Sequence, residues 1–158
     1  MDVGAALVDL ALAHGRDAIA VVGTAKNVGK TVAFAAICDA LERRETVAGV
    51  VAIGRDGEAV DALDAAPKPR LRLRAGTLLA TAQALVGRHP ALELVAESDE
   101  TSALGRIVIA RVRRTGTYEF AGPPTARGVR RIVDRLREHG ARTVAIDGAI
   151  DRIAALRD

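Results

Sequence analysis

The sequence predicts an α/β fold, with a three-layer, doubly wound and mainly parallel sheet. Apolar runs rich in β-branched residues occur at 18–22, 47–53 and 142–146, and stretches with the apolar spacing of helices lie between them. Runs without polar alternation are typical of parallel strands buried on both faces. Hydrophobic residues make up 49% of the chain and aromatic residues only 2%, which predicts a core of Ala, Val, Leu and Ile. A chain of 158 residues is long enough for one domain with a single core.

The N-terminal part predicts a helix followed by one βαβ unit. Residues 3–13 have helical spacing, with Val3, Leu7 and Leu10 on one face and Gly15 after the end. We expect this helix to lie across the outside of the sheet. The βαβ unit consists of a strand at 18–22, a helix to about residue 44 and a strand at 47–53. The crossover between its two strands is expected to be right-handed.

The rest of the chain predicts short strands and two helices. In order, we expect a half-exposed strand at 71–74, a helix at 77–86, a short strand at 91–96, strands at 107–112 and 117–120, a helix at 126–139 and a strand at 142–146. Thr77 and Thr125 are placed to cap the two helices, and Gly87 and Gly140 to end them. Because the turn at 114–116 contains a glycine, the strands beside it are expected to form a β-hairpin, at an edge or in an insertion.

The first strand opens into a glycine-bounded loop and then a helix. The loop residues are Gly23, Thr24, Ala25, Lys26, Asn27, Val28, Gly29, Lys30 and Thr31. A strand, such a loop, Gly-Lys-Thr and a helix form the arrangement of a phosphate-binding loop, although the strict pattern has a glycine where Thr24 stands. Glycines let backbone N–H groups turn toward an anion, and the helix N-terminus adds unpaired donors and partial positive charge. The alternative is a glycine-rich turn that binds nothing.

Polar side chains of this loop are candidate ligands for phosphate and metal. Lys30 is expected to reach the β- and γ-phosphates of a nucleotide, and the Thr31 hydroxyl to ligate Mg²⁺. The chain has 23 basic residues but only Lys26, Lys30 and Lys68 are lysines, so two of the three lysines lie in the loop. A compact ammonium suits a phosphate loop better than a planar guanidinium. Lys26 is a second candidate phosphate ligand, from the same subunit or across a dimer.

Two acids follow predicted strands at the edge of the sheet where ligands of open α/β folds bind. Asp147 comes directly after the strand at 142–146, which is the Walker B arrangement of an acid that holds Mg²⁺ through water, opposite the loop threonine. Asp56 lies in a polar turn after the strand at 47–53 and is a candidate for holding Mg²⁺ or positioning water. For each acid, the alternative is an Asp-Gly turn without chemistry.

These motifs resemble two known groups of proteins. Gly23-Thr24, Val28-Gly29-Lys30-Thr31 and Asp147-Gly148-Ala149 are similar to the loop and the Glu-Gly-Ala segment of dethiobiotin synthetase, a P-loop protein of the SIMIBI class. The resemblance covers the nucleotide-binding half and implies ATP and Mg²⁺ as ligands. That family's lysine–proline pair after the second strand has no counterpart in residues 52–56, which counts against biotin chemistry. Short segments look more like accessory proteins of cobalamin-dependent amino-acid aminomutases: 53–58, 68–70, 76–78 and 146–149.

Composition and charge count against several other classes. A net charge of +3, arginines interleaved with acids at 130–138, and few aromatic residues argue against nucleic-acid binding. Cys38 is the only cysteine, so neither a disulfide framework nor a cysteine-rich metal site is predicted. Residues 1–13 carry acids and lack the basic segment of a signal peptide, and we identify no membrane span in the sequence. The expected location is the cytoplasm.

The sequence therefore predicts Mg²⁺-dependent binding and hydrolysis of a nucleoside triphosphate in support of a partner protein. The absence of an Asn-Lys-x-Asp guanine motif favours ATP, since Asn27 is the only asparagine. The alternatives are an ATP-dependent ligase or kinase of the dethiobiotin synthetase type, and a nucleotide-binding module without turnover. Because one short helix at 150–158 is all that follows the Walker B strand, we expect an unpaired sheet edge, completed in a homodimer or by a second polypeptide. The alternative is that the hairpin at 107–120 covers this edge.

Overall fold

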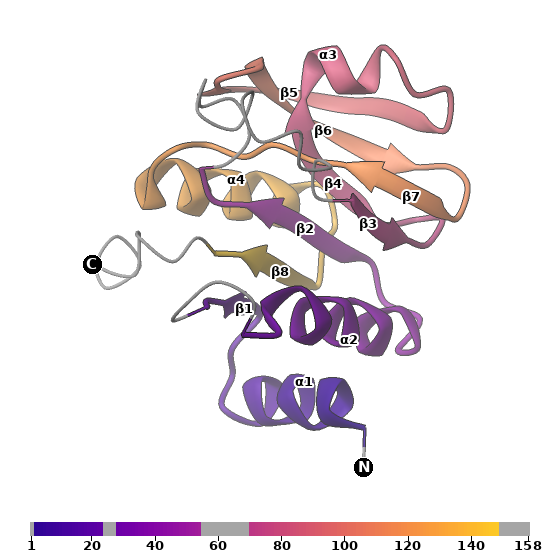
Figure 1. Ribbon diagram of the computed structural model, residues 1–158, viewed down its shortest axis with the longest axis vertical. Helices are drawn as coiled ribbons and strands as arrows, with labels where there is room; N and C mark the ends of the chain where they lie inside the picture. The colour runs from indigo at the N-terminus through magenta and orange to yellow at the C-terminus, as the bar shows by residue number, and fades with distance from the viewer. Residues whose placement is uncertain (1, 24–27, 55–69, 149–158) are drawn as a thin grey trace.

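The computed structural model describes residues 2–23, 28–54 and 70–148, and its elements are labelled in Figure 1. In chain order they are α1 (Val3–Ala13), β1 (Ala18–Val21), α2 (Lys30–Glu42), β2 (Ala48–Ala52), β3 (Arg70–Leu73), β4 (Leu78–Ala82), α3 (Gln83–Val86), β5 (Leu92–Ser102), β6 (Gly105–Val112), β7 (Gly116–Glu119), α4 (Ala126–Glu138) and β8 (Thr143–Asp147). Of the predicted C-terminal helix at 150–158, no residue lies in the described part.

The main sheet has six strands in the order β1-β8-β2-β4-β6-β5. Three neighbouring pairs are parallel, β1 with β8, β8 with β2 and β2 with β4. The pairs of β6 with β4 and with β5 are antiparallel. The predicted α/β class with a mainly parallel sheet is therefore confirmed. A second, two-stranded sheet pairs β3 with β7 in antiparallel orientation, and β3 alternates exposed and buried residues as its sequence predicts.

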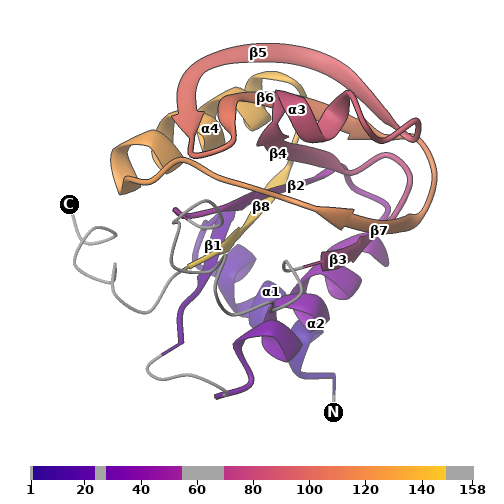
Figure 2. The same cartoon turned by 45° about the horizontal axis from the view of Figure 1, so that its top comes forward.

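Neighbouring residues of the central strands face opposite sides of the sheet, and each side is covered. Val50 of β2 belongs to a core shared with Phe34 and Ile37 of α2 and with the small sheet. Val51, the next residue, belongs to a second core shared with Ile132 of α4. Helices thus cover both faces of the central strands, as the two views show (Figures 1 and 2). This double burial explains why these strands are continuous apolar runs.

Helix α1 packs against α2 rather than across the sheet (Figure 1). Gly4 lies so close to Ala36 of α2 that a Cβ at this position would overlap the Ala36 carbonyl oxygen. Val8 is fully buried in this contact, whereas Val3, Leu7 and Leu10 are among the exposed large hydrophobic residues. The prediction that this helix lies across the outside of the sheet was therefore wrong, and the face with Val3, Leu7 and Leu10 is not the buried one. The glycine decides the contact, because only there can the two backbones approach closely.

The predicted helix at 77–86 is mostly a strand. Leu78–Ala82 forms β4, every residue of which is buried between β2 and β6, and only the four residues of α3 are helical in this region. Leu and Ala favour helices by intrinsic propensity. A central position in the sheet buries both faces of the segment, and this tertiary burial outweighs a weak local preference.

The predicted hairpin at 107–120 does not form, because β6 and β7 belong to different sheets. The hairpin that does form joins β5 to β6, with Ser102 opposite Gly105. β5 is much longer than the strand predicted at 91–96, since it continues to Ser102. Its pairing with β6 shifts register between Leu94 and Ala96 and again between Glu97 and Thr101. The turn at 114–116 instead connects the two sheets.

The predicted long helix and its ends are confirmed. α4 spans Ala126–Glu138, and the Thr125 side chain accepts a hydrogen bond from the Gly128 N–H, as an N-cap does. Gly140 has a φ of +104°, the left-handed conformation that glycine adopts easily at a helix end. Because α4 runs opposite to the parallel strands, its N-terminus lies at their carboxyl ends.

Candidate functional site

The carboxyl ends of three adjacent parallel strands form the base of the candidate site. Asp147 is the last residue of β8 and lies in register with Val21 of β1 and Ala52 of β2. The Gly148 N–H donates to the Val21 carbonyl at 2.9 Å, and the Ile53 N–H donates to the Asp147 carbonyl at 2.8 Å. The backbone of Asp147 is thereby held from both sides, and its carboxyl group is presented at the strand end.

Helix α2 begins beside this edge. Its N-cap is Gly29, which has a φ of +84° and makes no side-chain hydrogen bond. Among the described residues, no atom outside its chain neighbours would contact a Cβ at Gly29, and its left-handed backbone is the conformation that favours glycine. Lys30 is the first residue of the helix. The first-turn N–H groups of a helix have no partners within the helix and favour a negative charge.

The Lys30 ammonium donates a hydrogen bond to the Asp147 carboxylate. These residues are 117 positions apart in sequence, and they form an ion pair whose side chains are 25% and 17% exposed. The pair is therefore largely shielded from water, and it joins the start of α2 to the end of β8. The structure thus brings together the cation and the acid that the sequence predicts to contact phosphate and metal.

A segment that the sequence analysis did not single out forms part of the same edge. A Cβ at Gly122 would overlap the Ala52 carbonyl oxygen, so this glycine allows the connection between β7 and α4 to pass directly against β2. The Gly54 N–H then donates to the Pro123 carbonyl at 2.7 Å. The Gly-Pro-Pro sequence at 122–124 is not among the predicted site residues. Its glycine and prolines did indicate a fixed turn, but not the strand that it contacts.

Some of the remaining predicted site residues lie in the part of the chain that the structure describes, and others lie outside it. Gly23 is buried, whereas Val28, Gly29 and Thr31 are exposed. The Thr31 side chain lies in the first turn of α2. Three groups of predicted residues lie outside the described residues: Thr24, Ala25, Lys26 and Asn27 of the loop, Asp56, and Ala149.

Cys38 is buried in α2, in the same core as β8. The pKa of its thiol is raised to about 12, chiefly by burial and further by the negative charges of Asp39, Glu42 and Asp147. A thiol with such a pKa stays protonated near neutral pH and is a poor nucleophile. Its burial indicates that Cys38 packs in the core.

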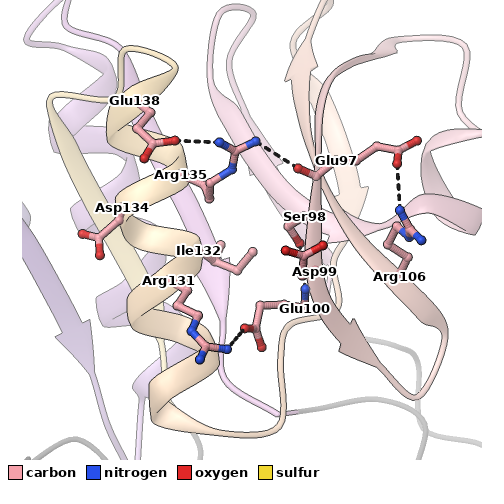
Figure 3. Close-up of a pocket in the computed structure, with 10 residues that line it drawn as sticks. All are labelled: Glu97, Ser98, Asp99, Glu100, Arg106, Arg131, Ile132, Asp134, Arg135 and Glu138. Carbon is pink, nitrogen blue, oxygen red and sulfur yellow. Dashed lines mark hydrogen bonds and ion pairs between the residues drawn. The ribbon is translucent and has the colours of Figure 1, made fainter.

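A cavity in the described part of the structure lies apart from this edge. It has a volume of about 740 Å³, and residues of β5, β6 and α4 line it (Figure 3). None of the described residues of the predicted phosphate loop lines it, and neither does Asp147. Arg131 bridges to Glu100 at 2.7 Å, and Arg135 contacts both Glu138 and the Glu97 carbonyl. We interpret these contacts as fastening α4 to the long hairpin.

In comparisons with known proteins, no family model, no curated protein and no solved structure matches the chain. Among residues 2–23, 28–54 and 70–148, no helix is long and apolar enough to span a membrane. In the same described segments, no three His, Cys, Asp or Glu side chains gather in a group that could hold a metal ion.

Proposed function

We propose that this chain is a P-loop protein of the SIMIBI class that binds ATP with Mg²⁺ at residues 23–31 and hydrolyses it in support of a partner protein. The observation that carries the proposal is the ion pair between Lys30 and Asp147. It supports the proposal because the lysine of the predicted loop and the acid of the predicted Walker B strand, which are far apart in sequence, are in contact. The pair places a lysine at a helix N-terminus beside a strand-end carboxylate, which is the arrangement that the two predicted motifs require.

The arrangement fits a phosphate group. The Lys30 ammonium already holds an oxyanion, the carboxylate of Asp147, beside the N-terminus of α2. A phosphate oxygen has the same charge sign and hydrogen-bonding capacity as a carboxylate oxygen. The same position therefore suits a β- or γ-phosphate, with backbone N–H groups of the first helical turn as further donors.

The arrangement also fits Mg²⁺ bound together with phosphate. Mg²⁺ prefers oxygen ligands, and it is usually held by one or two carboxylates, water and substrate phosphates rather than by a protein cage. The carboxylate of Asp147 and the hydroxyl of Thr31 are such ligands, and the described residues contain no larger acid cluster. The metal would stabilise negative charge that develops on the transferred phosphoryl group.

In the proposed reaction, a water oxygen attacks the γ-phosphorus. The bond between the γ-phosphorus and the β–γ bridging oxygen breaks at the same time. The products are ADP and inorganic phosphate, and the water proton is released to solvent or to a base. Lys30 would hold the phosphate oxygens, and the first turn of α2 would orient them. Asp56 and Lys26, which were predicted to position water and to contact phosphate, keep those roles as predictions.

Two alternatives share the same binding site. In an ATP-dependent ligase or kinase of the dethiobiotin synthetase type, an acceptor replaces water as the nucleophile. In a nucleotide-binding module, ATP stays intact. The experiment that distinguishes hydrolysis from both alternatives measures phosphate release from ATP without any added acceptor. Steady release over many turnovers is expected for the hydrolase, and not for the ligase or kinase or for the binding module.

Nucleotide binding itself is tested by calorimetry with the Lys30→Ala variant. Loss of a charge-assisted contact costs about 1.5–3 kcal/mol, so the affinity for Mg·ATP should fall by at least about tenfold. Arg88→Ala, which removes an equal charge from an exposed residue after α3, is the matched control and should bind like wild type. Equal affinities of wild type and Lys30→Ala would disprove the proposed phosphate site. Titrations with GTP in parallel establish the base preference.

A further inference from the structure

We propose that the cavity between α4 and the hairpin of β5 and β6 binds a small organic cation with two or more ammonium groups, that is, a linear polyamine. The cavity has a volume of about 740 Å³, and small-molecule sites typically have volumes of about 300–1,000 Å³. The proposal does not depend on the proposed nucleotide site, because the cavity lies on other elements of the fold (Figure 3).

One wall of the cavity is an irregular part of β5. Four consecutive residues, 97–100, line the cavity, although successive side chains of a regular strand point to opposite faces of the sheet. From Glu97 to Thr101, β5 contains two residues more than the segment of β6 with which it pairs. The extra residues form a bulge, and bulges change the direction in which side chains point. The bulge therefore explains how neighbouring side chains of one strand reach the same cavity.

The hydroxyl group of Ser98 holds this bulge in place. It donates a hydrogen bond to the Ile107 carbonyl at 2.7 Å and accepts one from the Glu100 N–H at 3.2 Å. Ser98 is only 9% exposed, so both hydrogen bonds are largely shielded from water. A buried hydroxyl with both a donor and an acceptor partner fixes the backbone around it. This wall of the cavity is therefore formed in advance, as ligand sites usually are.

The arginines of the cavity are not available to an anionic ligand. Three arginines are among the described lining residues, and each is paired with a carboxylate of the same cavity. The pairs are Arg106–Glu97 at 2.8 Å, Arg131–Glu100 at 2.7 Å and Arg135–Glu138 at 2.7 Å. In Figure 3, Arg131 and Arg135 reach from α4 toward β5. A phosphate or carboxylate ligand would have to displace these carboxylates, so the cavity disfavours anions.

The two remaining acids give the cavity a surplus of negative charge. Within the described residues, the carboxylate of Asp99 has no hydrogen bond or ion pair, and in Figure 3 it lies between the contacts of Arg131 and Arg135. Asp134, on the α4 wall, pairs with Arg137, which does not line the cavity. Ile132 is the only apolar side chain among the described lining residues. The cavity therefore suits a polar, positively charged ligand.

A ligand with two ammonium groups can serve both walls. Each ammonium group has three donors, and its hydrogen bonds to carboxylates are charge-assisted. One group would contact Asp99 on β5 and another Asp134 on α4. The chain as a whole has a net charge of +3, so its overall charge repels such a ligand. Binding must therefore come from the local arrangement of carboxylates.

The test is titration of the intact, ¹⁵N-labelled chain with spermidine, without nucleotide, followed by amide chemical shifts. In about 0.1 M NaCl, charges farther apart than about 10 Å are largely screened, so close contacts determine the affinity. Wild type should bind one spermidine with a Kd of about 1 mM or lower. The largest shifts should lie within 97–106 and 131–138. No saturable shift up to about 10 mM, or shifts centred elsewhere, would overturn the proposal.

Variants of Asp99 test the role of the carboxylates. Asp99→Asn should weaken spermidine binding at least about threefold, because an exposed ion pair is lost. Asp99→Glu keeps the charge and should bind within about twofold of wild type. Asp99 is exposed, so neither substitution disturbs the core. If Asp99→Asn binds as tightly as wild type, the cavity is not the site.

The matched control is Asp9→Asn, which removes the same charge from a side chain that is 66% exposed. Asp9 belongs to α1, at the opposite end of the molecule from β5 in Figure 1. This variant should bind spermidine like wild type, and an equal loss in both variants would assign the effect to net charge and refute the proposal. 1,4-Butanediol, an uncharged analogue of a four-carbon diamine, should cause no saturable shift. Saturable binding of the diol would show that the ammonium groups are not what the cavity recognises.

Discussion

Gly122 lies directly against the carbonyl group of Ala52, with no space for a Cβ between them. This contact joins the connection before α4 to the end of β2, the strand next to Asp147 in the sheet. The Gly54 N–H fixes the same contact through the Pro123 carbonyl. The edge that carries the candidate site thus depends on a glycine far from the phosphate-binding loop in sequence.

We expect Gly122→Ala to destabilise the fold, because the new methyl group must push two backbone segments apart. Overpacking in a well-packed site costs typically about 1–3 kcal/mol. Gly87→Ala is the matched control, since a Cβ there would have its nearest neighbour at an ordinary 3.8 Å. Urea unfolding of both variants measures the difference. Equal stabilities of Gly122→Ala and wild type would show that the two segments separate without cost.

We expect the stability to fall at high pH because of Cys38. An unfolded cysteine ionises above about pH 8.5, whereas the pKa of the folded thiol is raised to about 12. Between these values the folded chain binds one more proton than the unfolded chain, so the free energy of unfolding decreases as pH rises, by up to about 1.4 kcal/mol per pH unit. The contribution is fully present below the unfolded pKa.

The measurement compares wild type with Cys38→Ala between pH 8 and 10. Cys38→Ala leaves a small cavity and lowers the stability at every pH, but it removes the thiol's share of the slope. A steeper decline for wild type than for the variant is the expected result. Parallel curves would mean that the thiol ionises as easily in the folded chain as in the unfolded one.

We expect the chain to self-associate or to bind a second polypeptide through the free side of β1. Within the part of the chain that the structure describes, β1 pairs only with β8. The proposed alternative, a hairpin at 107–120 that covers this edge, is excluded because β6 pairs with β4 and β5, and β7 pairs with β3. Strand β1 carries none of the charges or prolines that protect natural sheet edges.

Light scattering with size-exclusion chromatography tests this expectation on the purified chain. Ala20 is the exposed residue of β1, so Ala20→Lys should shift an oligomer toward monomer, whereas Ala13→Lys on the exposed end of α1 should not. A stable monomer that binds ATP tightly by itself would mean that the edge needs no partner. An oligomer unaffected by Ala20→Lys would place the interface elsewhere.

Local signals in the sequence were sufficient for the first βαβ unit and for the two ends of α4. Gly29 was assigned to the loop from its neighbours alone, and the structure gives it a left-handed backbone at the start of α2. Thr125 and Gly140 were predicted to flank α4, and they do. These features depend on interactions within a few residues, so the local sequence contains the information that determines them.

Pairing partners, by contrast, were decided only in the tertiary structure. The hairpin prediction paired β6 with its neighbour in sequence, whereas β6 pairs with β4 and β5, and the helix prediction missed the buried position of β4. The face of α1 that is buried is the one on which Gly4 closely approaches Ala36, and not the one with Val3, Leu7 and Leu10. From the sequence, Lys30 was predicted in a phosphate-binding loop and Asp147 at the end of a strand, and Asp147 is the last residue of β8. Only the fold could bring these two charges into contact, because strand order and helix packing depend on burial across the whole chain, which no short segment encodes.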